Sequence, residues 1–402
     1  MVCEGHVCCL ERRNMERKLE KILRDAIEKQ ELAGGALLVQ DVNGRSLCRL
    51  EAGMADREAG TAITENTIFR LYSMTKPVTA AAAMILLERG ELCLQMPVGE
   101  YLPAFRGQKV WNGGKLEETR RPVLIRDLLQ MTSGLTYDGQ GSETERQTTR
   151  LLETLTDSLF TSHPWTTQEV AGRLGELPLL YQPGTSWKYG LSADVLGAVM
   201  EQIAEMPLAD FMKKEIFDPL GMEDTGFYVP EEKQGRLAAA YENGPDGTLI
   251  RYTGCHLGIR NDMKVLPAFQ SGGAGLASTL EDYGKFARML LQNGRWENRQ
   301  ILSPRTVEYM TAGKLACCQQ REFDQWVGME GCSYGNLMRK MWDPERAMTL
   351  SSRGEYGWDG WLGCHFANCP EDGISIIFMQ QKKGVGHVTE RIRNVVFSSL
   401  NR

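Results

Sequence analysis

The sequence predicts an α+β fold, in which an antiparallel β-sheet is flanked by N- and C-terminal helices and interrupted by a helical insertion domain. Strand-like segments occur near both ends of the chain, at residues 35–41 and 46–51 and at residues 363–367 and 374–380. Between them the chain has the pattern of successive helices joined by loops rich in Pro and Gly. The two ends are therefore expected to meet in one sheet, with the helical middle as an insertion.

The N-terminal elements are a helix and a hairpin. The first segment, residues 15–31, carries apolar side chains at helical spacing, namely Met15, Leu19, Ile22, Leu23, Ala26 and Ile27. Asn43-Gly44 separates the first two strand-like segments and is the strongest short signal for a β-hairpin. We expect residues 1–14 to form a tail and Met15 to open the first helix.

The middle of the chain predicts a mainly helical domain over residues 96–269, with loops that line a cleft. The sheet domain is expected to combine residues 15–95 and 270–402, with the cleft between the two parts. A last helix is expected over residues 388–400. The other predicted helices are residues 77–95, 123–134, 144–160, 166–176, 191–205 and 208–217.

Composition narrows the classes of partner. A net charge of −6 argues against nucleic acid and anionic membranes. No apolar run approaches the length of a membrane span. The 11 cysteines and five histidines lack metal-binding spacing. We therefore expect a cytoplasmic protein that needs no metal or cofactor and binds neither nucleic acid nor membrane.

Ser73 and Lys76 form the candidate reactive pair. Three residues apart on a helix, they lie on one face, one turn apart. An unprotonated amine there can take the proton of the hydroxyl, which makes an acyl-transfer nucleophile without a histidine. Because Pro77 is tolerated only in the first turn of a helix, Ser73 is expected at a helix N-terminus. An ordinary N-cap serine is the alternative, since this spacing arises by chance about once in such a chain.

Six blocks, in this order and spacing over about residues 20–400, resemble the serine β-lactamase and penicillin-binding-protein superfamily. The class C β-lactamase-like branch, which includes family VIII carboxylesterases and D-amino-acid-releasing peptidases, is the most similar part of it. The blocks are Ser73–Lys76, Leu128–Leu135, Gln182–Gly197, Pro219–Gly226, Ser271–Tyr283 and Gly357–Gly363.

The resemblance implies a role for Tyr189, which matches the tyrosine of the family's Tyr-x-Asn element. Its phenol would pass a proton to the leaving group or help to deprotonate Ser73. A buried aromatic with a satisfied hydroxyl is the alternative. The family's asparagine is Leu191 here, which cannot donate an amide hydrogen bond to a substrate. We expect Leu191 to lie in the substrate-binding region.

The resemblance also aligns the family's Lys-Thr-Gly strand with Trp358, Asp359 and Gly360, followed by Trp361. Gly360 would let the substrate approach the strand, and the backbone N–H groups of Ser73 and Trp361 would form the oxyanion hole. Trp358 in place of the lysine, together with Asp359, favours an uncharged ester or amide over an anionic β-lactam. Strand alternation places Trp358 and Asp359 on opposite faces, so only Trp358 is expected to line the cleft closely. A packed strand with its tryptophans in the core is the alternative.

The sequence thus predicts a serine hydrolase that forms an acyl-enzyme on Ser73, most simply a carboxylesterase acting on small esters or amides. Lys76 would be the base, with its pKa lowered by burial and by neighbouring positive charge. The alternatives on the same residues are a β-lactamase, an acyltransferase and a D-aminopeptidase. A non-catalytic homologue that binds a ligand is the alternative from another class.

Overall fold

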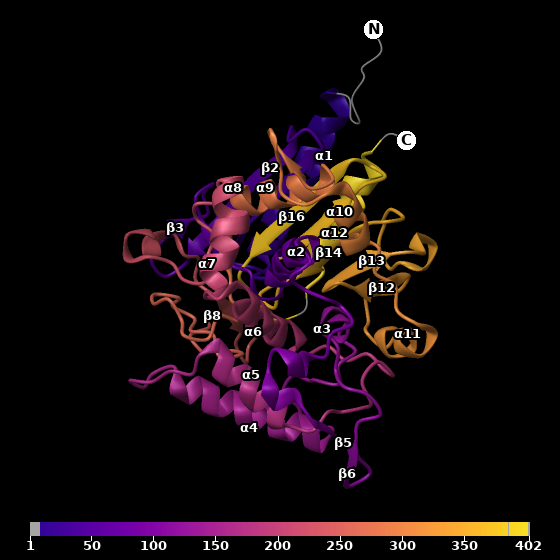
Figure 1. Cartoon of the computed structure of the whole chain (residues 1–402). Helices are drawn as coiled ribbons and strands as arrows, with labels where there is room; N and C mark the ends of the chain where they lie inside the picture. Colours follow the sequence, from indigo (N-terminus) through magenta and orange to yellow (C-terminus); the bar gives the residue numbers. More distant parts are fainter. Residues whose placement is uncertain (1–8, 385, 401–402) are drawn as a thin grey trace.

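The computed structural model describes residues 9–384 and 386–400 of the chain, with the side chains of residues 9–11 left aside. It contains a twisted eight-stranded sheet whose paired strands run antiparallel, with helices on both faces (Figure 1). The strand order is β12-β13-β14-β15-β16-β1-β2-β3. In chain order these strands are β1 (Gly34–Asp41), β2 (Ser46–Asp56), β3 (Thr61–Ala62), β12 (Cys332–Gly335), β13 (Met338–Met341), β14 (Tyr356–Asp359), β15 (His365–Cys369) and β16 (Ile374–Gln380).

The two ends of the chain meet in this sheet, as the sequence predicts. Strand β1 pairs with β2 through the Asn43-Gly44 turn and with β16 on its other side, where Leu38 lies opposite Ile377. The predicted α+β class with an antiparallel sheet is therefore confirmed. The C-terminal strand expected over residues 363–367 is β15, which begins two residues later, at His365.

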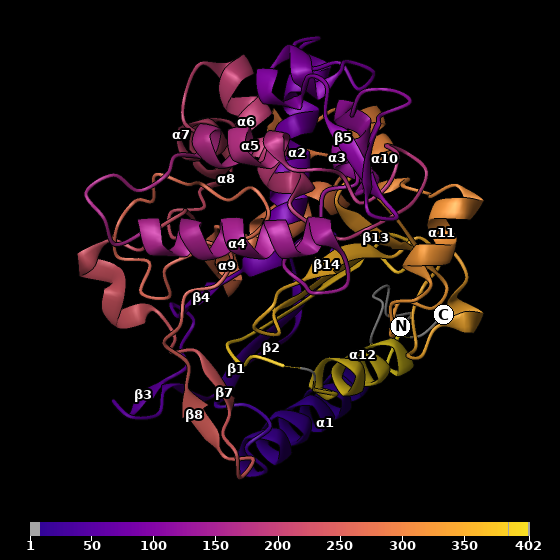
Figure 2. The same ribbon diagram turned by 90° about the horizontal axis from the view of Figure 1, so that it is seen from below.

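Helices α1 (Cys9–Glu28) and α12 (Val388–Ser398) lie side by side along one face of the sheet (Figure 2). Their apolar side chains, including Leu19 and Ile392, form a buried cluster with Leu37 and Phe378 of the sheet. Helix α1 begins at Cys9 rather than at Met15, so part of the predicted tail is helical. Residues 1–8 lie outside the described residues.

The opposite face of the sheet is covered by α2 (Thr75–Glu88) and α9 (Leu280–Leu291), with the helical middle beyond them (Figure 2). That middle contains α3 (Ile125–Gln130), α4 (Glu143–Ser158), α5 (Thr167–Glu176), α6 (Ser192–Ala204) and α7 (Leu208–Met212). One buried apolar cluster joins Leu128 and Leu196 of the helical part to Phe366 and Ile377 of the sheet. The division into two domains stays a prediction. No helix in the described part of the chain is both long and apolar enough to cross a membrane.

The shorter elements complete the fold. Small two-stranded sheets are formed by β4 (Ile68–Arg70) with β9 (Ala277–Thr279), β5 (Lys109–Asn112) with β6 (Lys115–Glu118), β7 (Tyr241–Asn243) with β8 (Leu249–Arg251), and β10 (Arg295–Trp296) with β11 (Arg299–Gln300). The remaining α-helices of the described residues are α8 (Asp218–Leu220), α10 (Pro304–Thr311) and α11 (Cys317–Phe323), and a π-helical segment, Lys213–Phe217, joins α7 to α8. The pairing of β4 with β9 matters most for function, because β4 leads directly to Ser73.

Candidate active site

Ser73 lies in a tight turn at the start of helix α2. The 3₁₀ turn Tyr72–Met74 connects β4 to this helix, and Leu71 donates its N–H to the carbonyl oxygen of Leu276 at 2.8 Å. Tyr72 has φ +45°, a conformation that is costly for a bulky residue and requires support from its surroundings. Ser73 is 9% exposed. A strand therefore fixes Ser73 at the positive end of a buried helix, and this position is the one that the sequence predicts.

Lys76 is fully buried beside Ser73 and has three partners. Its Nζ lies 3.1 Å from Ser73 Oγ, 3.1 Å from Tyr137 Oη and 2.8 Å from the carbonyl oxygen of Gly273. A neutral amine has two N–H donors and one lone pair. Because the carbonyl of Gly273 can only accept, one N–H goes to Gly273, and the other can go to Tyr137. That arrangement leaves the lone pair for the hydroxyl hydrogen of Ser73.

Burial lowers the pKa of Lys76 to about 7. The negative charge of Asp194 opposes this shift, since it favours the protonated amine. The prediction that a neighbouring positive charge helps to lower the pKa of Lys76 is therefore wrong, because the charged neighbour is the carboxylate of Asp194. Desolvation alone brings the unprotonated form of the Lys76 amine within reach of neutral pH.

Asp194 is a site residue that the sequence analysis missed. Its Oδ1 accepts hydrogen bonds from Ser271 Oγ at 2.5 Å and from the backbone N–H of Gly273 at 3.1 Å. A Cβ on Gly273 would stand 2.7 Å from Asp194 Oδ2, so glycine permits this close approach. Asp194 thus holds the loop that presents the Gly273 carbonyl to Lys76. The available signal was a carboxylate in the first turn of a helix whose next six residues are all apolar or glycine.

Two phenols, from Tyr189 and Tyr137, lie beside Ser73 and Lys76. Lys76 Nζ lies 4.6 Å from the centre of the Tyr189 ring. The pKa of both phenols is raised overall, because burial is the largest effect. Hydrogen bonding to the Ser73 hydroxyl opposes this rise in pKa but does not cancel it. The structure thus brings Tyr189 to the place predicted for it. Tyr137 was missed; it comes two residues after the block Leu128–Leu135, just past the turn that follows α3.

Trp358 of β14 holds Tyr189 in position. Its indole Nε1 donates a hydrogen bond to Tyr189 Oη at 2.8 Å. Trp358 is 2% exposed, so the indole is part of the wall behind Tyr189 and does not offer the broad stacking surface expected for a substrate. Leu191 is 1% exposed and packs in the main apolar cluster, so its side chain presents no surface to a substrate either.

Asp359 lies on the other face of β14 and binds different partners. Its carboxylate is 2.8 Å from Arg339 Nη1 and 2.5 Å from His365 Nδ1. Burial acts to raise the pKa of Asp359, but Arg339 and His365 outweigh it and lower the pKa to about 2. Strand alternation thus separates Trp358 from Asp359, as predicted, and Asp359 carries a charge that is already paired.

Gly360 allows the end of β14 to pack directly against the segment before Ser73. A Cβ at this position would stand 2.4 Å from the carbonyl oxygen of Leu71. The glycine is therefore required for a contact within the chain. The prediction that it makes room for the substrate is not the reason for a glycine at this position. The next residue is Trp361, whose ring centre lies 5.0 Å from that of Tyr72 in the turn that carries Ser73.

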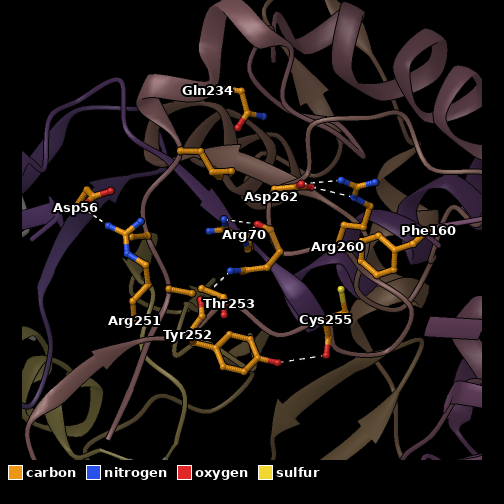
Figure 3. Close-up of a pocket in the computed structure, with 14 residues that line it drawn as sticks. Asp56, Arg70, Phe160, Gln234, Arg251, Tyr252, Thr253, Cys255, Arg260 and Asp262 are labelled. Carbon is orange, nitrogen blue, oxygen red and sulfur yellow. Dashed lines mark hydrogen bonds and ion pairs between the residues drawn. The ribbon is translucent and has the colours of Figure 1, made fainter. Parts of the chain in front are cut away.

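A pocket of about 390 Å³ lies beside the strand that leads to Ser73 (Figure 3). Arg70 is in its centre, with Tyr252 and Cys255 below it and the Arg260–Asp262 ion pair on one side (Figure 3). Arg70 is buried, and its guanidinium donates hydrogen bonds to the backbone carbonyls of Ala238 and Asn261. None of Ser73, Lys76, Tyr189 or Tyr137 lines this pocket, which is therefore separate from the candidate active site.

The chain is similar to known proteins along most of its length. The family model for Beta-lactamase matches residues 19–397. Protein Rv1367c of Mycobacterium tuberculosis is 33% identical over 350 residues, which cover 82% of this chain and 81% of that protein. Esterase EstB of Burkholderia gladioli is 30% identical over 411 residues, which cover 97% of each.

Solved structures show the same fold. The structure of EstCE1, described as a hydrolase with promiscuous acyltransferase activity, has a TM-score of 0.80 at 26% identity and covers 96% of this chain and 100% of that one. Simvastatin synthase (LovD) from Aspergillus terreus has a TM-score of 0.79 at 21% identity, covering 94% and 97%, which supports the fold alone. The extent of the family match and the identity to Rv1367c and EstB show that this chain belongs to the Beta-lactamase family.

Proposed function

We propose that this protein is a serine carboxylesterase that forms an acyl-enzyme on Ser73. The observation that carries the proposal is the buried Lys76 Nζ, 3.1 Å from Ser73 Oγ, with a pKa lowered to about 7. At neutral pH a large fraction of this lysine is unprotonated and can act as a base. Its relatives EstB and EstCE1 are described as an esterase and a hydrolase, which supports the same reaction class.

In the acylation step, the Oγ–H bond of Ser73 breaks and its proton moves to Lys76 Nζ. The oxygen forms a bond with the ester carbonyl carbon, and the carbonyl oxygen becomes an oxyanion. When the ester C–O bond breaks, the leaving alkoxide oxygen takes a proton from Tyr189 Oη, and Tyr189 recovers a proton from Lys76 through Tyr137, whose hydroxyl lies 3.1 Å from Lys76 Nζ. Tyr189 is suited to this donation because burial keeps its phenol protonated.

Two backbone N–H groups, those of Ser73 and Trp361, would stabilise the oxyanion. Ser73 is at the N-terminal end of α2, where free N–H groups and the helix dipole favour negative charge. The contact of Gly360 with the carbonyl oxygen of Leu71 supports this role, because it joins the segment that carries Trp361 to the segment that leads to Ser73. In deacylation, water gives a proton to the same base system and attacks the acyl carbon. The acid is released and Ser73 recovers its proton.

The expected substrates are small, uncharged esters, and amides as a slower class. Trp358 stands where the resemblance places a lysine, so this position supplies an N–H to Tyr189 but no positive charge for a β-lactam carboxylate. Acyl transfer is a second candidate, because EstCE1 is described as having promiscuous acyltransferase activity and MokF of Monascus pilosus, 26% identical over 325 residues, is described as an acyltransferase. We also propose a cytoplasmic location, since the described cysteines are free thiols.

Turnover of a neutral ester against turnover of an anionic β-lactam tests the substrate class. We expect kcat/KM for p-nitrophenyl butyrate to exceed that for nitrocefin by at least about 100-fold. A factor of this size corresponds to the loss of one charge-assisted hydrogen bond to the carboxylate of nitrocefin. The measurement is initial rates on both chromogenic substrates with the same enzyme preparation. Preference for nitrocefin would contradict the esterase assignment and support a β-lactamase.

A further inference from the structure

Trp326 is the most exposed of the eight tryptophans and lies next to the candidate active site. It follows α11 in the loop after Phe323 and is 37% exposed, and the adjoining Val327 is 94% exposed. Two consecutive large apolar side chains that are exposed to water are unfavourable, and such pairs commonly mark a binding surface.

The indole of Trp326 forms the outer layer of an aromatic cluster around Tyr189. Its ring centre is 4.9 Å from that of Tyr189, and it stacks on Trp358 at 5.8 Å with 21° between the planes. Trp187 is also within 5.5 Å. Trp187 and Trp358 are 5% and 2% exposed, so within this cluster Trp326 is the tryptophan with a face open to solvent.

We propose that Trp326 is the wall of a subsite for the leaving alcohol and selects esters of apolar, aromatic alcohols. The inference rests on the proposed function, because Tyr189 as proton donor must lie within hydrogen-bond distance of the leaving oxygen. The substituent on that oxygen then extends past the Tyr189 ring, toward the open face of Trp326. An aromatic ring there stacks on the indole and is removed from water.

A purely structural role for Trp326 predicts a different outcome. If the indole only supported Tyr189, its loss would slow all esters equally, because the proton donor would be misplaced for each of them. A wall of the alcohol subsite instead affects substrates according to the alcohol. Two butyrate esters separate these cases, benzyl butyrate and ethyl butyrate, whose acyl parts are identical and whose alcohols have similar acidity.

For Trp326→Ala we expect kcat/KM for benzyl butyrate to fall about tenfold, mainly through KM, and that for ethyl butyrate to change less than about threefold. Trp326→Phe keeps an aromatic face and should lose less than about threefold on benzyl butyrate. Trp342→Ala is the matched control. This half-buried tryptophan donates its indole N–H to Gly313 and packs beside Lys314, so its loss should change neither ester selectively.

Equal loss on the two esters in Trp326→Ala, or equal loss in Trp326→Ala and Trp326→Phe, would overturn the subsite. Labelling of Ser73 by a fluorophosphonate is measured in parallel with the wild-type protein. If Ser73 is labelled and Trp326→Ala shows no selectivity, the subsite fails while the proposed function stands. If Ser73 is not labelled and esters are not hydrolysed, the proposed function itself fails.

Discussion

Replacement of Ser73 by alanine is expected to lower the turnover of p-nitrophenyl butyrate by at least about 10⁴-fold, to the level of a protein with no nucleophile. The variant removes the atom that forms the acyl bond, and it leaves Lys76 with its contacts to Gly273 and Tyr137. Folding should be retained, since one small hydroxyl is lost. The rate is measured with an active-site titration of the wild type, and the melting temperature is recorded for both proteins.

Ser375→Ala is the matched control for this experiment. Ser375 is a buried serine of β16, and its hydroxyl donates to Asn368 Oδ1 at 2.6 Å. Its replacement should lower stability by about 1 kcal/mol and leave the active-site serine reactive toward a fluorophosphonate. Turnover and labelling that survive in Ser73→Ala would exclude Ser73 as the nucleophile.

The second large effect is expected for Lys76→Met, which should lower kcat/KM by at least about 10³-fold. Methionine has nearly the length of lysine and is accepted in a buried site, but it cannot take the Ser73 proton. Gly273 and Tyr137 lose a hydrogen-bond donor, which should reduce the free energy of unfolding by about 1–3 kcal/mol. Stopped-flow acylation by p-nitrophenyl butyrate is the measurement.

Lys340→Met is the control with the same change of side chain. Lys340 of β13 is also partly buried, which lowers its pKa, and its Nζ lies 5.4 Å from the centre of the Trp342 ring. Normal acylation is expected in this variant. A Lys76→Met protein that acylates at more than about a tenth of the wild-type rate would show that another group removes the serine proton.

The sequence predicted the first helix and the first hairpin correctly, because each of them depends on residues that are close together in the chain. Asn43-Gly44 defines a hairpin with few neighbours involved, and the apolar spacing in residues 15–31 requires a helix whatever lies against it. The start of α1 was placed too late because Cys9–Asn14 is not apolar at helical spacing, although Arg12 donates hydrogen bonds to the carbonyl oxygens of Ser46 and Leu47 in the next hairpin. Tertiary contact, which the sequence does not display, extends that helix.

The same distinction applies to the residues of the candidate site, some of which the sequence identifies and some of which only the fold brings together. Ser73 and Lys76 are one helical turn apart, and a family block marks Tyr189. Tyr137 and Asp194 belong to the site only because the folded chain brings them to Lys76 and to the loop at Gly273, 61 and 79 residues away along the sequence. No spacing rule covers such distances.

The incorrect expectations about Trp358 and Leu191 have a common origin. Alignment to a motif gives the place of Trp358 and Leu191 in the chain but does not give the direction of their side chains. Leu191 directly precedes α6 and is buried in the main apolar cluster, and Trp358 donates its indole N–H to Tyr189. The sequence pattern also suggested that Gly360 makes room for the substrate. In the structure, the carbonyl oxygen of Leu71 occupies the space that a side chain at this position would need.

The central claim is that burial makes Lys76 a base near neutral pH, and the pH dependence of Ser73 acylation tests it most directly. A lysine pKa lowered in the folded protein means that the protonated, inactive form predominates below that pKa and the unprotonated base above it. With a fluorophosphonate, which does not titrate in this range, the acylation rate should rise with an apparent pKa of about 7 and then reach a plateau. A rate that is flat between about pH 6 and pH 9, or one that rises only near the ordinary lysine pKa of about 10.4, would contradict the account.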